Sequence, residues 1–567
     1  MKKLINAVGD VVPEMLEGLV AGAPGLVLLE GQTVVLRRDH ARLGGRVALV
    51  SGGGAGHEPA HGGYVGPGML TGAVVGDVFT SPSTDAVLAA VRAIAEGGSA
   101  SGVLLVVKNY TGDRLNFGLA AELARAEGTD VEMVVVGDDV ALAADGHHAG
   151  RRGLAGTVLV HKVAGAAAER GDDLAGVRAL AQRVADDVRS MGVSLGACTV
   201  PAVGEPGFSL AEDEVEWGLG IHGEAGVERG AIASADDTAA RLVGAVAEDA
   251  GLSDGDRVVL LVNDLGATPP SELDIVARGA LAHLRERGVT VERMWVGRFL
   301  TALDMPGCSV SVLPVDDELL GLLDAPTETA AWPAPHQGLV AAPEAVTPPA
   351  AAEEPPTGER LAADSPVRRA LDAACTAVRE AEPELTRMDS EVGDGDLGTG
   401  LERGATAVQD EVDRYGADPV SALRDTSATL RRAIGGTSGP LYSILLMRAA
   451  ASLEDAGSTE PAAWAAALRA GADGIMEVGG AEVGDRTMLD ALVPLATSFA
   501  QHLDAGDDPA SAWRDAVAAA EQGTASTAGT AARVGRSSYL GDRVKGTPDP
   551  GARAVVIWAD AVGRALG

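Results

Sequence analysis

The residue pattern of the chain changes at a proline-rich segment, residues 325–360, and this change constrains the fold more than any other feature. The segment holds eight of the 28 prolines, with many Ala and Glu residues and no periodic apolar pattern. Such a composition is typical of a semi-extended linker. Before it, short β-branched runs alternate with amphipathic stretches, and after it the β-branched runs vanish. The sequence therefore predicts two domains of different class, residues 1–324 and 361–567.

The first domain has the alternation of strands and helices that is typical of an α/β fold. Because such strands usually form sheets covered by helices, we expect an α/β region made of two subdomains. The segments that predict strands are 46–50, 103–107, 131–136, 258–262 and 291–296, and those that most clearly predict helices are 84–95 and 174–188.

The second domain is predicted to be all-α. About eight helical segments follow from Ser365 onward, and several open with a capping residue and a proline, as in Ser365-Pro366 and Asp508-Pro509. No solenoid-type repeat is present in the sequence, and the two domains look unrelated in pattern.

Charge and cysteine content limit the partners and the compartment. A net charge of -36 disfavours nucleic acid and anionic lipid as partners. The three cysteines, Cys198, Cys308 and Cys375, form no C-x-x-C pair, so neither a disulfide framework nor a thiolate zinc site is indicated. No apolar run is long enough for a signal peptide or a membrane span. We expect a cytoplasmic protein without a nucleic-acid or membrane partner.

Three aspartates crowd a short glycine-rich segment of the second domain, residues 387–400. Asp389, Asp394 and Asp396 would repel one another unless cations were present, and oxygen ligands of this kind select hard ions such as magnesium together with phosphate oxygens. An EF-hand calcium loop is excluded, because Thr399 and Ala405 stand where Gly and Glu would be needed. A solvated acidic turn remains open from this segment alone.

A second glycine-rich turn, residues 435–440, directly precedes the helical run 441–450. Free backbone N-H groups and two hydroxyls at the positive end of a helix would hold a phosphate well. Taken singly, such a turn is more often the end of a helix with no ligand. The chain contains neither the Walker A pattern nor G-x-G-x-x-G, so P-loop and Rossmann sites are excluded.

The first domain carries its own candidate chemistry at predicted strand ends. A glycine-rich segment with His57 follows strand 46–50, and Asp113 follows strand 103–107, so the two side chains are expected to converge for acid/base work. His222 lies between glycines and could be a nucleophile towards a carbonyl carbon. Each residue alone is more often a hydrogen-bonded loop histidine or a capping aspartate.

Five motifs of the second domain, in order, resemble the nucleotide domain of dihydroxyacetone kinases: Asp389 with 393–396, then 436–439, 484–490, 535–541 and 549–552. The resemblance implies an eight-helix barrel in which Asp389, Asp394 and Asp396 hold two magnesium ions on the phosphates of ATP. The nucleotide-binding residues that it implies are Gly398, Thr399, Gly400, Thr437, Ser438, Gly479, Met488, Arg536, Asp549, Pro550 and Gly551.

Four segments of the first domain, 51–61, 108–113, 150–157 and 218–226, resemble the substrate domain of the same family. The resemblance implies that His222 forms a covalent hemiaminal with the ketone, that His57 is its acid/base partner, and that Asp113 activates the terminal hydroxyl. The implied substrate-binding residues are Gly54, Ala55, Gly56, His57, Lys108 and Asp113. One departure is Asp264 in the turn Asn263-Asp264-Leu265-Gly266, where the family more often has Asn.

The predicted function is therefore ATP-dependent phosphorylation of dihydroxyacetone by a homodimer, in which domain swapping would join the two sites. Fusion of both domains in one chain favours ATP over a phosphoenolpyruvate-fed phosphocarrier. Alternatives that stay open are a kinase for glyceraldehyde or for a four-carbon ketose such as erythrulose, a lyase that releases a cyclic nucleotide from FAD, and a carbonyl-ligand sensor without catalysis.

Overall fold

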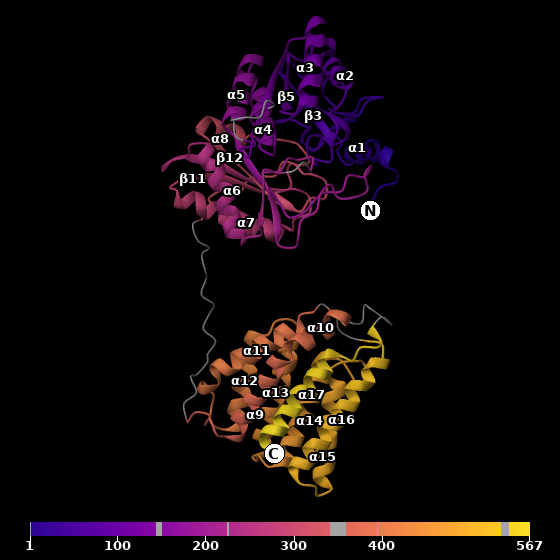
Figure 1. Cartoon of the computed structure of the whole chain (residues 1–567), viewed down its shortest axis with the longest axis vertical. Coiled ribbons are helices and arrows are strands. Elements are labelled where there is room, and N and C mark those ends of the chain that lie inside the picture. The colour runs from indigo at the N-terminus through magenta and orange to yellow at the C-terminus, as the bar shows by residue number, and fades with distance from the viewer. Residues whose placement is uncertain (1, 143–149, 224–225, 341–358, 394, 534–543) are drawn as a thin grey trace. The chain divides into compact units, whose positions relative to one another are not determined.

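The computed structural model describes residues 2–142, 150–223, 226–340, 359–393, 395–533 and 544–567. The chain divides into two compact units, Met1–Ala345 and Val346–Gly567, which are considered separately below. Figure 1 shows an α/β first unit and an almost entirely helical second unit, as the sequence predicts.

The first unit contains two six-stranded sheets, which confirms the two expected α/β subdomains. In the first sheet the order is β1-β2-β4-β3-β5-β6, and the last four of these strands are parallel. In the second sheet the order is β11-β10-β12-β7-β8-β9, and only β10 and β11 pair in parallel. The strands are β1 (Leu26–Leu28), β2 (Val34–Arg37), β3 (Ala48–Ala55), β4 (Gly72–Val78), β5 (Val103–Lys108), β6 (Val131–Val136), β7 (Arg189–Ser194), β8 (Glu214–Trp217), β9 (Glu228–Ala231), β10 (Arg257–Asp264), β11 (Thr290–Gly297) and β12 (Gly307–Pro314).

Helices cover both faces of each sheet and build three apolar cores. One core joins α2 and α3 to the outer face of the first sheet, and another joins α6 and α7 to the outer face of the second. A central core between the sheets contains α4, α5 and α8 (Figure 1). The helices of this unit are α1 (Val11–Ala21), α2 (Thr84–Ala95), α3 (Thr111–Ala126), α4 (Thr157–Arg170), α5 (Leu174–Asp187), α6 (Ala235–Asp249), α7 (Pro270–Glu286) and α8 (Asp317–Asp324).

The glycine-rich segment around residues 51–55 is part of strand β3, whereas the sequence suggested a loop after the strand. The segment is buried throughout and pairs with β4. Glycine is needed there because neighbouring backbone lies too close for a side chain: a Cβ at Gly54 would lie 2.5 Å from Thr80 N. The glycines of this segment therefore lie inside the sheet.

The predicted linker begins too early, because residues 325–340 pack on the first unit. Thr327 Oγ1 donates to Pro67 O at 2.8 Å, and Ala331 N donates to Gly63 O at 3.1 Å. Trp332 is buried, with its ring centroid 5.0 Å from that of Trp295. Proline content suggested an isolated segment, but apolar side chains spaced between the prolines dock it. The rest of the predicted linker, residues 341–358, lies outside the described residues.

Eight helices of the second unit form a closed ring, which agrees with the eight-helix barrel that the resemblance implies. Each helix packs on the next in the order α9, α11, α12, α13, α14, α15, α16, α17 and back to α9. The short helix α10 lies outside this sequence of neighbours and packs on α9, α11 and α17. The helices are α9 (Pro366–Glu380), α10 (Glu382–Val392), α11 (Leu397–Glu411), α12 (Pro419–Ala433), α13 (Ser438–Ala456), α14 (Pro461–Gly479), α15 (Leu489–Asp504), α16 (Pro509–Ser526) and α17 (Pro550–Leu566).

The predicted capping residues account for several helix starts in this unit. Ser365 and Asp508 each accept a hydrogen bond from a backbone N-H of the first turn, with proline as the first helical residue. Asp549 caps α17 in the same way. Among the described residues, no helix is long and apolar enough to cross a membrane.

Candidate active site

His57 lies at the end of β3 in a fully buried position. Its Nδ1 lies 2.8 Å from the carbonyl oxygen of Thr301, which only accepts, so Nδ1 carries the proton and Nε2 keeps a lone pair. Burial, together with the charges of Lys108 and His222, holds the pKa of His57 well below its usual value, and the hydrogen bond to Thr301 opposes this shift only in part. His57 is therefore a neutral base at pH 7.

His222 is half-buried and lies beside His57, so the two histidines that the sequence places 165 positions apart do meet. Their ring centroids are 4.9 Å apart, at an interplanar angle of 63°. The rings of Phe79 and Tyr110 also meet His222 edge-on, at 5.2 Å and 4.6 Å. The imidazole is thus enclosed by rings on several sides.

Lys108 and Asp113 approach the same point from β5 and the first turn of α3. Both side chains lie against Gly53: if this residue had a Cβ atom, it would lie 2.9 Å from Lys108 Nζ and 3.7 Å from Asp113 Oδ2. Both side chains are buried, and no described residue hydrogen-bonds to Asp113 Oδ1. Because an unpaired buried carboxylate oxygen is costly, this atom is suited to receive a ligand hydroxyl. The structure thus brings His57 next to His222 and within electrostatic reach of Lys108, and it places Asp113 near the same glycine as Lys108.

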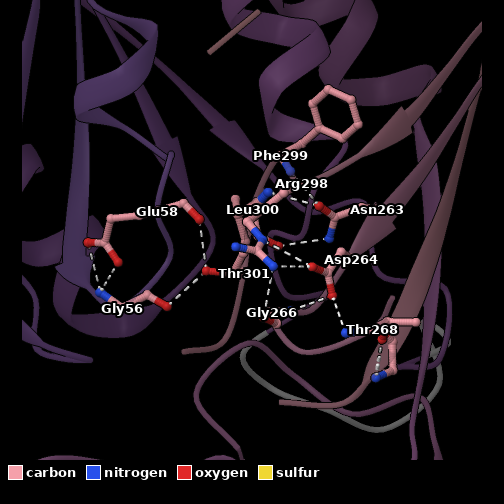
Figure 2. A network of polar contacts seen from close by, with 11 residues as sticks. Gly56, Glu58, Asn263, Asp264, Gly266, Thr268, Arg298, Phe299, Leu300 and Thr301 are labelled. Atoms are coloured by element: carbon pink, nitrogen blue, oxygen red, sulfur yellow. Dashed lines mark hydrogen bonds and ion pairs between the residues drawn. The ribbon is translucent and has the colours of Figure 1, made fainter. Parts of the chain in front are cut away.

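A polar network around Asn263, in β10, positions residues 299–301, and the carbonyl of Thr301 accepts the hydrogen bond from His57. Figure 2 shows this network. Asn263 Oδ1 accepts hydrogen bonds from Phe299 N and Leu300 N, both at 2.9 Å, and its Nδ2 donates to Leu300 O at 2.8 Å. The next residue, Thr301, donates through Oγ1 to Glu58 O at 2.9 Å. The His57 tautomer is therefore set by the carbonyl of Thr301, 244 positions away in sequence, and Asn263 of β10 holds the two residues before it.

Replacing Asn263 by alanine is expected to lower the free energy of unfolding by about 2–4 kcal/mol, because two buried N-H groups would lose their acceptor. Asp264→Asn is the matched control, because its side-chain oxygen can still accept from Gly266 N and Thr268 N. This variant loses only the ion pair with the half-exposed Arg298, and such a pair contributes about 1 kcal/mol or less. Urea unfolding of both variants measures the difference. Equal stabilities would contradict the role assigned to Asn263.

The predicted nucleotide residues within the described ranges lie at one end of the helical ring. Neighbouring helices joined by short connections run antiparallel, so the N-termini of α11, α13, α15 and α17 lie at the same end. A Cβ at Gly551 would lie 3.6 Å from Met488 Cβ, and one at Gly436 would lie 4.0 Å from Asp396 Oδ2. The positive N-terminal ends of four helices therefore lie at one end of the ring, and this arrangement suits a polyphosphate.

Acidic side chains stand among these helix ends. Asp389 is largely buried and accepts from Leu397 N at 3.1 Å, while Asp396 is exposed at the start of α11. Burial raises the pKa of Asp549 to about 6; Arg486 opposes this shift, and the charges of Asp490 and Asp389 add to it. A buried carboxyl whose ionised form is disfavoured by burial and by two neighbouring carboxylates suits a place that receives a hard cation.

The predicted nucleotide residues differ in exposure, since some are open to solvent and others are packed. Thr399, Thr437 and Gly479 are exposed at the ring end, whereas Gly398 is buried and provides close packing, since a Cβ there would lie 2.5 Å from Glu382 O. Asp394 and Arg536 lie outside the described residues. Among the described residues, no group of three or more His, Cys, Asp or Glu side chains could hold a metal ion.

Sequence reasoning missed Phe79, Tyr110, Thr301 and Asn263. The available signal was weak: Phe79 directly follows strand β4, and Tyr110 stands two positions after Lys108. Nothing local in the sequence marks Thr301 as the partner of His57.

Known proteins resemble this chain along nearly its whole length. Residues 17–331 match the Dak1 domain family and residues 391–564 match the DAK2 domain family. The triokinase/FMN cyclase of Homo sapiens is 44% identical over 98% of this chain and 97% of its own. The D-erythrulose kinase of Mycolicibacterium smegmatis is 38% identical over 99% of this chain and 98% of its own.

A solved structure agrees with these matches. The crystal structure of the dihydroxyacetone kinase from C. freundii in complex with AMP-PNP and Mg2+ is similar with a TM-score of 0.63, at 33% identity, and the match covers 99% of each chain. The buried histidine and aspartate site, the helical ring and these similarities agree, and the chain belongs to the dihydroxyacetone kinase family.

Proposed function

We propose that this protein phosphorylates dihydroxyacetone with ATP, giving dihydroxyacetone phosphate, and that the ketone is held as a covalent hemiaminal on His222. The observation that carries the proposal is the meeting of His222 with the neutral His57, next to the buried Lys108 and Asp113. A nucleophile, a base and a second base for a hydroxyl lie within one small site. That set matches a covalently held hydroxycarbonyl substrate.

The steps follow from the proton positions in this site. The His222 lone pair attacks the ketone carbon, the imidazole gives up a proton, and the carbonyl oxygen becomes a hydroxyl. His57 Nε2, which holds a lone pair, takes the proton that the His222 imidazole gives up and passes it to this oxygen. Gly54, Ala55 and Gly56 let the substrate approach the backbone, and Lys108 orients it. Asp113 then accepts the proton of the terminal hydroxyl, whose oxygen attacks the γ-phosphorus of ATP. As this bond forms, the bond between the γ-phosphorus and the bridging oxygen breaks, and ADP leaves.

The helical unit is proposed to bind ATP through Gly398–Gly400, Thr437, Ser438, Gly479, Met488, Arg536 and Asp549–Gly551. Asp389, Asp394 and Asp396 would hold two magnesium ions, which when bound neutralise charge on the phosphates. The four helix N-termini at this end of the ring and the raised pKa of Asp549 support this assignment.

Phosphorylation by the purified chain alone tests the donor and the substrate together. We expect turnover with ATP and magnesium, without a phosphocarrier, and kcat/KM is to be compared for dihydroxyacetone, glyceraldehyde, erythrulose and glycerol. Rejection of glycerol is expected, since a polyol has no carbonyl carbon for His222. Activity that required phosphoenolpyruvate and an added phosphocarrier would refute the ATP assignment, and a clear preference for erythrulose would favour the four-carbon alternative.

Asp389→Ala is expected to abolish ATP turnover, lowering kcat by about 10³-fold or more, because one carboxylate that holds the metal would be lost. Isothermal titration with magnesium and a non-hydrolysable ATP analogue should show weakened binding, while the first unit still forms its ketone adduct. The exposed Asp455 provides an Asp→Ala control, because it lies one residue before the end of α13 and therefore at the other end of the ring. Turnover within tenfold of the wild type would remove Asp389 from the site.

We further propose a domain-swapped homodimer, in which the nucleotide unit of one copy serves the substrate unit of the other. Mixing the inactive variants His222→Ala and Asp389→Ala tests this, since only a swapped dimer combines an intact substrate unit with an intact nucleotide unit across two chains. Restored turnover after mixing supports swapping. No restoration, in a preparation that exchanges subunits, would contradict it.

A second candidate activity is release of a cyclic nucleotide from FAD at the same metal-binding end. The similarity to a triokinase/FMN cyclase over nearly the whole chain favours testing it. Incubation with FAD and manganese, followed by chromatography for a cyclic flavin nucleotide, gives the answer. No product under conditions where ketone phosphorylation proceeds would exclude this activity.

A further inference from the structure

Phe79 has an unusual backbone conformation next to the two active-site histidines. Its φ is 57°, one of three positive φ values at non-glycine residues in the described part of the chain. A bulky residue in this left-handed region costs about 1 kcal/mol or more, so the surrounding structure must hold it there. Phe79 N donates to Ala55 O at 2.9 Å, which ties the residue to the glycine-rich end of β3.

Two glycines of the predicted substrate segment provide space for Phe79. A Cβ at Gly54 would lie 2.8 Å from Phe79 Cα, and a Cβ at Gly56 would lie 2.8 Å from Phe79 Cε1. Real Cβ atoms do not approach so closely, so a side chain at either position would displace the phenylalanine. The glycine pattern of this segment is therefore linked to the presence of a large ring at position 79.

The ring of Phe79 contacts both histidines at once. It stacks on His57, with centroids 5.1 Å apart and planes 19° apart, and it meets His222 edge-on at 5.2 Å and 77°. Tyr110 meets His222 from another direction at 4.6 Å and 78°. Since aromatic contacts of these geometries are favourable, the rings hold the two imidazoles at a fixed separation.

We propose that Phe79 is a positioning and specificity-determining residue, whose ring orients His57 and His222 and limits the length of the carbonyl compound that fits against His222. The inference rests on the proposed function. One hydroxymethyl group of the bound ketone must reach Asp113, and the other substituent of the carbonyl carbon must fit beside His222, where the rings of Phe79 and Tyr110 take up space. A ring of fixed size there would discriminate a three-carbon from a four-carbon substrate.

The alternative is that Phe79 only fills a small apolar cluster. Leu303, Met305 and Phe208 belong to this cluster together with Phe79. Phe208 is the matched control, because it packs on the same cluster and has no ring contact with either histidine among the described residues. Phe79→Asn separates the loss of the ring from the strain of the backbone, since asparagine tolerates the left-handed conformation but has no ring.

The experiment compares the wild-type full chain with Phe79→Leu, Phe79→Asn and Phe208→Leu. For each protein, kcat and KM are measured for dihydroxyacetone and for erythrulose, with the melting temperature as a check on folding. We expect Phe79→Leu to raise the erythrulose to dihydroxyacetone ratio of kcat/KM about tenfold, within the range that one methylene contributes in a pocket. Both Phe79 variants should lose kcat/KM for dihydroxyacetone, and Phe208→Leu should keep the wild-type ratio within about twofold whatever its stability.

The outcomes separate the two proposals. A wild-type chain that phosphorylates neither compound would refute the proposed function. An active wild type whose ratio stays unchanged in folded Phe79→Leu and Phe79→Asn would overturn this inference alone, and so would a Phe208→Leu variant that shifts the ratio as much as Phe79→Leu.

Discussion

His222→Ala is expected to lower kcat/KM for dihydroxyacetone by about 10³-fold or more, because the variant lacks the nucleophile that holds the carbonyl carbon. The loss should appear largely as weakened ketone binding, while the affinity for magnesium and ATP stays as in the wild type. Steady-state kinetics and titration with a nucleotide analogue measure the two effects separately.

A histidine far from the chemistry provides the control for this variant. His336 is exposed, although its backbone pairs with Met294, so His336→Ala should leave both kcat and KM within about twofold of the wild type. If His222→Ala turned over dihydroxyacetone within tenfold of the wild type, the covalent role would have to be withdrawn.

Acidification from pH 7 to pH 5 is expected to destabilise the first unit strongly through three buried histidines, His57, His61 and His161. Burial lowers the pKa of all three, that of His161 to about 3. Each stays neutral in the native state but binds a proton in the unfolded state below about pH 6.5. The unfolded state then binds more protons, so stability present above pH 6.5 is lost as the pH falls, by about 2 kcal/mol per histidine at pH 5.

Three largely buried carboxyls of the first unit, those of Glu58, Asp138 and Asp139, act in the opposite direction. Burial raises the pKa of each, that of Asp139 to about 6, so their contribution to stability is largest at low pH and is lost as the pH rises through the raised pKa values. The contribution of the histidines is therefore best measured by comparing wild type with a histidine variant. Hydrogen exchange in the peptides that cover β3 and α4 gives the stability of this region at each pH. His161→Gln should lose about 2 kcal/mol of the pH dependence, and His336→Gln should lose none. Identical pH dependence in wild type and His161→Gln would contradict neutral buried histidines.

Local sequence signals predicted the elements well and the site only in part. Strands such as 103–107 follow from β-branched runs, and helix starts such as Ser365-Pro366 follow from capping chemistry, because both depend on near neighbours. The extent of the linker was predicted less well, since docking of residues 325–340 depends on apolar side chains such as Trp332 finding partners in the first unit.

The candidate site shows the same limit at the level of single residues. His57 and Asp113 could be expected to meet because both follow strands of one parallel sheet. The residues that position His57 could not be predicted in this way. Asn263 lies in the other sheet and Thr301 lies after its strand β11, so both come near His57 only through the tertiary fold. Phe79 was missed for a further reason: its importance lies in a backbone conformation that no residue pattern predicts for phenylalanine.

Carbon-13 NMR of the full chain with dihydroxyacetone labelled at the carbonyl tests the central claim most directly. We expect the signal of the bound ketone to move from the carbonyl region to that of a tetrahedral carbon, and to return to the carbonyl region in His222→Ala. Addition of ATP and magnesium should then convert the labelled ketone to its phosphate. A bound ketone that keeps its carbonyl signal in the wild type, or an adduct that persists without His222, would contradict the account.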